Sequence, residues 1–278
     1  MEPNEIAQIS ERFGGSCEPQ PLEGGQGRSW RSTTASGDIV VKPAPHPDEV
    51  RWIGKTFSQL TFSPDVRVPR PVATGQGEWI VQDHVAWTWI EGKETVGNYD
   101  DKLIAARAFH TGVRSLKRPS FVDYRSDPWA LADRVAWSER SADYDAHTMT
   151  ALAPILEMAE SASMPEGVRA QVIHGDLSGN FVFADGLSPG IIDITPYWRP
   201  EGFAEAVIWI DSIWFSACIS PDAFVQPGMA TFVLRALARR LAEQPEQVAA
   251  GLKTAAEAAG VVTHLNEATE KLLEPWLS

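Results

Sequence analysis

The stretch QVIHGDLSGNFVFADGLSPGIIDIT, residues 171–195, decides the fold of this chain. Within it, two short apolar runs, residues 181–183 and 190–192, flank a segment of turn-forming residues, a pattern that predicts a β-hairpin. Asn180 and Asp193 would then lie side by side at the open end of the hairpin, although they are thirteen positions apart in the sequence.

These polar residues have the chemistry of a phosphoryl-transfer site. An amide oxygen beside a carboxylate suits Mg²⁺, which prefers a few hard oxygen ligands together with water and nucleotide phosphates. Asp176 lies four residues before Asn180 and could accept or orient the proton of an attacking hydroxyl. The structural alternative is that Asp176 and Asn180 cap turns and that Asp193 ends a strand.

The segment HGDLSGN, residues 174–180, followed by Asp193, resembles the HGDxxxxN and ID signatures of aminoglycoside phosphotransferases and choline kinase-like small-molecule kinases. That family shares the protein-kinase fold. The resemblance implies an α+β chain with a small N-terminal lobe, built of an antiparallel sheet and one helix, and a larger, mainly helical C-terminal lobe. It also implies that Asp176 is the catalytic aspartate, that Asn180 and Asp193 hold magnesium, that His174 braces the loop, and that ATP or GTP donates the phosphate.

The rest of the chain agrees with a two-lobed organisation. The first part has short β-rich runs separated by Gly, Pro and Asp, at residues 28–34, 38–42, 78–82 and 84–90. Apolar residues at helical spacing predict one helix over residues 47–60, and longer helices follow from residue 99 onward. We therefore expect an N-terminal nucleotide-binding lobe over residues 1–92 and a mainly helical catalytic and acceptor lobe over residues 93–278.

The N-terminal part also offers candidate nucleotide-binding residues. Gly25, Gln26 and Gly27 lie between two predicted strands, where backbone amides could approach phosphates, although an ordinary hairpin turn would have the same composition. Lys42 ends an apolar strand and resembles the phosphate-binding lysine of the kinase small lobe; otherwise it is a solvated charge. Glu49 is the only glutamate in the helix that follows, which makes it the candidate partner of Lys42.

Three consecutive residues, Trp89, Ile90 and Glu91, resemble the connector whose backbone holds the nucleotide base in this family. Side-chain identity is only loosely restricted in that role, so the prediction concerns a location. Trp79, Trp87 and Trp89 alternate as they would in a strand, and packing between sheet and helix is favoured over base stacking.

Asp211 is an acidic residue in the otherwise apolar helix FAEAVIWIDSIWF, residues 203–215. An uncompensated charge there would cost several kcal/mol, so Asp211 needs internal hydrogen bonds. It resembles the helix aspartate that braces the catalytic loop in kinase-like folds. A capped or solvent-facing aspartate is the alternative.

One departure from the family leaves two functional classes open. Many relatives carry a second acid two positions after the metal aspartate, where this chain has Thr195. The first class is an active kinase that phosphorylates a hydroxyl of an amino sugar, aminoglycoside or amino alcohol. The second is a catalytically weak or inactive kinase-like protein that binds a nucleotide or ligand. The presence of Lys42, Asp176, Asn180 and Asp193 together favours the enzyme.

The net charge and the composition of the chain indicate which kinds of partner and which location to expect. A formal net charge of −13 opposes nucleic-acid binding and favours a cationic small-molecule acceptor. The longest apolar stretch contains Glu205 and Asp211, so no membrane span is expected. With two cysteines and an acidic N-terminal segment, the sequence predicts a cytoplasmic protein.

Overall fold

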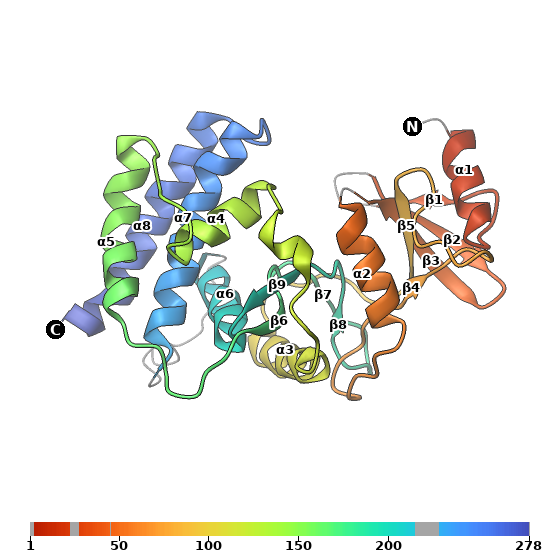
Figure 1. The fold of residues 1–278 in the computed structure, drawn as a ribbon, viewed down its shortest axis with the longest axis horizontal. Helices are drawn as coiled ribbons and strands as arrows, with labels where there is room; N and C mark the ends of the chain where they lie inside the picture. Colours follow the sequence, from red (N-terminus) through yellow and green to blue (C-terminus); the bar gives the residue numbers. More distant parts are fainter. Residues whose placement is uncertain (1–2, 23–27, 45, 215–227, 278) are drawn as a thin grey trace. The chain divides into compact units, whose positions relative to one another are not determined.

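The computed structural model describes residues 3–22, 28–44, 46–214 and 228–277. The chain forms two compact units, one of residues 1–94 with 181–193 and the other of residues 95–180 with 194–278. The elements of both units are labelled in Figure 1. The end of the first stretch lies two residues beyond the expected boundary at Gly92, and residues 181–193 group with the N-terminal part of the chain.

The first unit is built on a five-stranded antiparallel sheet with strand order β1-β2-β3-β5-β4. Its strands are β1 (Gln20–Pro21), β2 (Trp30–Thr34), β3 (Gly37–Pro43), β4 (Pro71–Val72) and β5 (His84–Thr88). Two helices belong to the same unit, α1 (Pro3–Arg12) and α2 (Pro47–Phe57). The predicted antiparallel sheet is therefore confirmed.

Strand β3 explains where Lys42 points. Ile39 and Val41 are buried in one hydrophobic cluster with Ile6 and Ile9 of α1. Successive side chains of a strand point to opposite faces of the sheet, so Lys42 lies on the face away from this cluster. Its ammonium lies 5.8 Å from the centre of the Trp87 ring on the adjacent strand.

The prediction of a strand over residues 78–82 is wrong. Val81 makes an isolated bridge to His84 across a tight turn in which Gln82 and Asp83 adopt φ angles of 45° and 60°, and residues 78–80 form no strand. The edge of the sheet is formed instead by β4, and a Cβ atom on Gly54 of α2 would lie 2.4 Å from the Trp79 ring. Trp79 therefore packs against a helix outside the strands.

The hairpin predicted from residues 181–192 is confirmed. Strands β7 (Phe181–Val182) and β8 (Gly190–Ile191) pair antiparallel, with Phe181 opposite Ile191 and Val182 opposite Gly190. All four residues are buried. Asn180 directly precedes β7, and Asp193 follows β8 by two residues.

The second unit is mainly helical, as predicted. Its helices are α3 (Tyr99–Val113), the 3-10 turn η2 (Ser120–Asp123), α4 (Pro128–Ala136), α5 (Ala146–Ser161), α6 (Glu201–Trp214), α7 (Ala230–Ala249) and α8 (Ala255–Leu277). Helix α7 is central because it packs against α4, α5, α6 and α8. No helix within the described residues is long and apolar enough to cross a membrane.

A two-stranded ribbon holds the candidate loop in the second unit. Strand β6 (Gln171–His174) is buried along its whole length and pairs antiparallel with β9 (Pro196–Arg199). The ribbon contacts α3 and α6. Since β6 ends at His174, the loop of residues 175–180 begins at a fixed point in the core.

Candidate active site

The loop after β6 is held by its own backbone. The Gly175 N–H donates to the Thr195 carbonyl over 3.0 Å, and the Asn180 N–H donates to the Leu177 carbonyl over 2.9 Å. Leu177 is buried and fixes the middle of the loop in the core. A Cβ atom on Gly175 would lie 2.0 Å from a ring carbon of Tyr197, so only glycine fits at this position.

His174 contacts the loop through its ring. Its Nδ1 accepts a hydrogen bond of 3.2 Å from the Asp176 N–H, and its own backbone N–H donates to Nε2 of His110 over 3.2 Å. Both histidines are buried, and the Phe109 ring packs edge-on against His174. Burial, then the neighbouring His174 and Arg114, lower the pKa of His110 to about 3, so His110 is neutral at physiological pH.

The side chains of Asp176 and Asn180 have different environments within this loop. Asn180 donates from Nδ2 to the Asp176 carbonyl over 2.5 Å, which leaves its amide oxygen as the acceptor atom. The Asp176 side chain is 43% exposed, although its backbone is held on both sides. Buried Lys102 of α3 donates to the carbonyl of Ser178 over 3.5 Å. The loop is therefore fixed while the carboxylate can meet a substrate.

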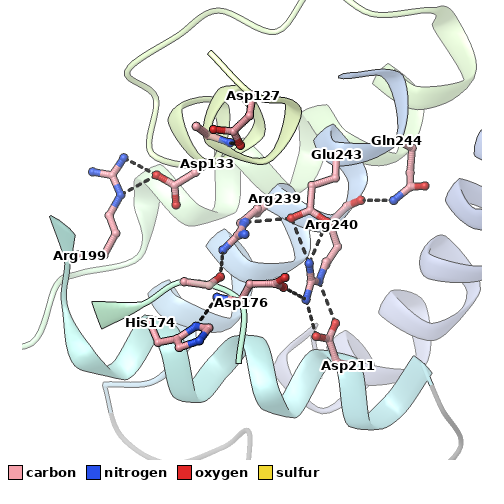
Figure 2. Close-up of polar contacts among 12 residues, drawn as sticks. Asp127, Asp133, His174, Asp176, Arg199, Asp211, Arg239, Arg240, Glu243 and Gln244 are labelled. Carbon is pink, nitrogen blue, oxygen red and sulfur yellow. Dashed lines mark hydrogen bonds and ion pairs between the residues drawn. The ribbon is translucent and has the colours of Figure 1, made fainter. Parts of the chain in front are cut away.

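Two consecutive arginines of α7 reach the same loop (Figure 2). Arg239 donates from Nη1 to the Gly175 carbonyl. Arg240 places Nη2 3.7 Å from Oδ1 of Asp176 and donates to Asp211 from two nitrogens, with Nε 2.8 Å from Oδ1. Sequence reasoning missed both arginines. The signal that could have found them is the run LRALARRLA, in which three arginines alternate with apolar residues, because buried charges need partners.

Asp211 is buried in α6, as the apolar surroundings of its sequence indicate. The sequence predicts that Asp211 supports the loop. In the structure its carboxylate binds Arg240, and Arg240 in turn lies beside Asp176. Burial would lower the pKa of Arg240, but Asp211, Glu243 and Asp176 raise it well above its ordinary value. Arg240 therefore stays charged.

In the first unit, Lys42 and Asp193 form an ion pair. The Lys42 side chain is 25% exposed and that of Asp193 is 60% exposed. Asp193 adopts a φ of 55°, a conformation that non-glycine residues seldom take and that often marks functional positions. Glu49, the residue expected to pair with Lys42, is buried on α2, whereas the ion pair of Lys42 is with Asp193.

Arg67 links the predicted connector, residues 89–91, to the hairpin of residues 181–192 through hydrogen bonds. This arginine donates from Nε to the Ser188 carbonyl over 2.6 Å and from Nη1 to the Glu91 carbonyl over 2.8 Å. The Trp89 N–H donates to the Asp38 carbonyl over 2.8 Å, and its ring lies 4.4 Å beneath the Arg31 guanidinium. The Glu91 carbonyl and the Trp89 N–H are thus already engaged within the protein.

Ile90 lies against the hairpin, where a Cβ atom on Gly190 would come within 2.5 Å of its side chain. The candidate phosphate-binding residues Gly25, Gln26 and Gly27 lie outside the described residues. The structure thus places Lys42 and Asp193 together in one unit, and Asp176, His174 and Asp211 together in the other.

The loop differs in length from the signature it resembles. Three residues separate Asp176 from Asn180, so HGDLSGN is one residue shorter than HGDxxxxN. The hydrogen bond from Asn180 to the Asp176 carbonyl closes this shorter loop. Thr195, at the position where many relatives have a second acid, offers its backbone carbonyl to Gly175.

Comparison with known proteins now identifies the family. The model of the phosphotransferase enzyme family matches residues 18–195, and the chain belongs to that family. No curated protein matches the chain in sequence. The family makes this protein a small-molecule kinase with a phosphotransferase fold, and it confirms the α+β kinase-like prediction.

Solved structures of low sequence identity share the fold. An amicoumacin kinase in complex with AMP-PNP, Ca²⁺ and Ami matches with a TM-score of 0.60 at 12% identity, covering 91% of this chain and 88% of that chain. The aminoglycoside phosphotransferase APH(4)-Ia matches with a TM-score of 0.58 at 13% identity, covering 96% and 98%. The spectinomycin phosphotransferase APH(9)-Ia, bound to ADP and spectinomycin, matches with a TM-score of 0.53 at 12% identity, covering 91% and 92%.

Proposed function

We propose that this protein transfers the terminal phosphate of ATP, or of GTP, to a hydroxyl group of a small molecule of the amino sugar, aminoglycoside or amino alcohol type, with magnesium. The observation that carries the proposal is the loop of residues 174–180. Its backbone is fixed by His174, Thr195 and Arg239, while the Asp176 carboxylate stays accessible. A fixed base that remains accessible is what phosphoryl transfer to an acceptor hydroxyl requires.

In the proposed reaction, Asp176 accepts the proton of the acceptor hydroxyl as the oxygen forms its bond to the γ-phosphorus. The bond between that phosphorus and the bridging β–γ oxygen breaks, and the nucleoside diphosphate leaves. Lys42 binds phosphate oxygens as a point charge. His174 keeps the loop in place, because its Nδ1 accepts the Asp176 N–H.

Two residues have the chemistry to hold magnesium. The amide nitrogen of Asn180 is used by the Asp176 carbonyl, which leaves an oxygen ligand, and Asp193 offers an exposed carboxylate. Magnesium usually takes one or two protein oxygens and completes its coordination with phosphates and water. This agrees with the finding that no group of three or more His, Cys, Asp and Glu side chains could hold a metal within the described residues. When bound, the ion would neutralise charge on the phosphates.

Further residues complete the proposed nucleotide site. Gly25, Gln26 and Gly27 would cover the phosphates with their backbone amides. Glu49 would support Lys42 from α2. Residues 89–91, which are Trp89, Ile90 and Glu91, would place the nucleotide base along the connector that Arg67 fastens.

The formal charge of −13 supports a cationic acceptor, since an acidic protein attracts amines. Similar structures are a spectinomycin phosphotransferase bound to spectinomycin and an aminoglycoside phosphotransferase bound to hygromycin B, which supports an acceptor of the aminoglycoside type here. A cytoplasmic location goes with this proposal, because ATP or GTP is the proposed donor.

A second candidate is a kinase-like binding protein with weak or no turnover. The observations that favour it are Thr195 at the position of the second acid and the loop that is one residue short. This candidate predicts nucleotide binding without phosphate transfer.

An acceptor screen separates the two candidates. Purified protein is incubated with ATP or GTP, with and without Mg²⁺, and a panel of amino sugars, aminoglycosides and amino alcohols, while phosphorylated products are followed by mass spectrometry. We expect product with at least one acceptor only when Mg²⁺ is present. Tight nucleotide binding with no product from any acceptor would instead support the binding protein.

A further inference from the structure

Arg240 of α7 lies at the centre of a buried ionic cluster around the candidate base. Its guanidinium donates to Asp211 from Nε over 2.8 Å, and to Glu243 from Nη1 over 2.8 Å. Asp211 and Glu243 are both 3% exposed, so the arginine is held by two rigid carboxylates from α6 and α7. The third carboxylate near it belongs to Asp176, with Oδ1 3.7 Å from Nη2 (Figure 2).

The geometry of the guanidinium sets what this cluster can do. A guanidinium presents five N–H donors in a rigid planar fork, so fixing two of its edges also fixes the direction of the remaining donors. Asp211 and Glu243 occupy Nε and Nη1, and Nη2 binds Asp211 while also facing Asp176. Arg240 therefore has one orientation, in which it attracts a single oxygen of the Asp176 carboxylate.

The neighbouring arginine fixes the backbone of the same loop. Arg239 is fully buried, binds the Gly175 carbonyl and places Nε 2.9 Å from Oε1 of Glu243. Consecutive residues of a helix point about 100° apart, so one arginine reaches Gly175 and the other reaches Asp176. Helix α7 thus holds the backbone and the side chain of consecutive loop residues.

We propose that Arg240 is a positioning residue for phosphoryl transfer. It orients the Asp176 carboxylate by attracting Oδ1, which directs Oδ2 toward the acceptor hydroxyl. Asp211 acts on the base through Arg240, and Glu243 holds the same arginine from within α7. This inference rests on the proposed function, since it assigns Arg240 to the base of that reaction.

The charges of the cluster favour a role of Arg240 in orienting the Asp176 carboxylate over a general electrostatic effect on it. Arg239 and Arg240 carry two positive charges, and Asp211 and Glu243 carry two negative charges, so the buried part of the cluster is close to neutral. The exposed carboxylate of Asp176 is the additional charge. A displacement of about 1 Å at a reacting group can cost about 100-fold in rate, so a positioning role is measurable.

The test compares Arg240→Lys and Arg240→Met with the wild-type protein, measuring kcat per folded molecule and the KM for ATP. Arg240→Met leaves Asp211 and Glu243 without their cation, and the variant could fail to fold. Arg240→Lys keeps the charge, but one ammonium cannot occupy all the positions of a planar fork. We expect kcat to fall about tenfold or more in Arg240→Lys and about 100-fold in Arg240→Met, with the KM for ATP changed less than about twofold.

Arg199→Met is the matched control. Arg199 also binds two carboxylates, those of Asp133 and Glu139 at 2.7 Å each, and its side chain is as buried as that of Arg240, at 12% against 10% exposed. Replacing an arginine that has only a structural role lowers the melting temperature but leaves kcat per folded molecule unchanged. This is the result expected for Arg199→Met. The same result for Arg240→Lys would overturn the proposal, whether or not Arg240→Met folds.

A crystal structure of Arg240→Lys supplies a readout that needs no activity. The proposal predicts that the Asp176 carboxylate changes its rotamer or becomes disordered while the backbone of residues 174–180 stays in place. An unchanged Asp176 carboxylate contradicts it. Failure of the wild-type protein to phosphorylate any acceptor would refute the proposed function instead, and the rotamer of Asp176 would still decide the role of Arg240.

Discussion

His110 gives a prediction whose size follows from its surroundings. It is fully buried on α3, receives the His174 N–H at Nε2, and has its pKa lowered to about 3. The unfolded chain has an ordinary histidine pKa of about 6.5 at this position. Between these two pKa values the unfolded state binds a proton that the folded state does not, so stability is lost as the pH falls below about 6.5.

The magnitude follows from linkage. From about pH 7.5 to about pH 5, this one histidine removes about 2 kcal/mol from the free energy of unfolding. For a chain of this size, that corresponds to a fall of roughly 4 to 8 °C in melting temperature. The groups that oppose protonation of His110 are His174 and Arg114, and burial is the largest cause.

The assay is a pair of melting-temperature profiles against pH for the wild-type protein and His110→Gln. Glutamine offers a carbonyl oxygen to the His174 N–H and does not titrate, while the other titrating groups remain in both proteins. We expect the wild-type profile to fall more steeply, by about 4 to 8 °C over this range, once the constant difference at neutral pH is subtracted. Parallel profiles would refute the reasoning.

Other predictions concern the loop and the lysine. Gly175→Ala would place a Cβ atom 2.0 Å from the Tyr197 ring and is expected to destabilise the fold by about 1 to 3 kcal/mol in urea titrations. Gly179→Ala meets nothing within 4 Å and should change the free energy of unfolding by less than about 0.5 kcal/mol; equal effects would show that the loop does not have this packing. Lys42→Met should weaken ATP binding about tenfold or more in calorimetry, yet cost less than about 1 kcal/mol of stability, because its pair with Asp193 is partly exposed. Unchanged ATP affinity would remove Lys42 from the nucleotide site.

Local signals in the sequence predicted much of the fold. The hairpin of residues 181–192 was predictable because its apolar runs and the turn between them are neighbours along the chain. The β-rich run of residues 38–42 likewise predicted a strand, and the structure has β3 there. Apolar residues at helical spacing from residue 99 onward indicated a helical second part, which the structure has.

The failures also have physical reasons. Residues 78–82 have the composition of a strand, but β4 pairs with β5 in their place, Gln82 and Asp83 turn the chain, and Trp79 packs on α2. Conformations with positive φ at non-glycine residues leave little signal in one sequence.

The cluster around Arg240 could not be predicted for a different reason. Arg240 lies 64 residues from Asp176, and contacts over such distances depend on how helices pack. The sequence indicated that Asp211 needs a partner, but nothing local identified Arg240. The length of the loop is a separate difference, because HGDLSGN has three residues between Asp176 and Asn180 where the signature has four.

The most direct test of the central claim is the turnover of Asp176→Asn beside the wild-type protein, with the same acceptor, ATP and Mg²⁺. Asparagine keeps the size of the side chain but cannot accept the proton of the hydroxyl. The account predicts that kcat falls at least about 100-fold, while the Kd for ATP and the melting temperature stay close to those of the wild-type protein. A variant that retains kcat within about threefold of the wild type would contradict the role of Asp176 as the base, because removal of a general base costs about 100-fold or more.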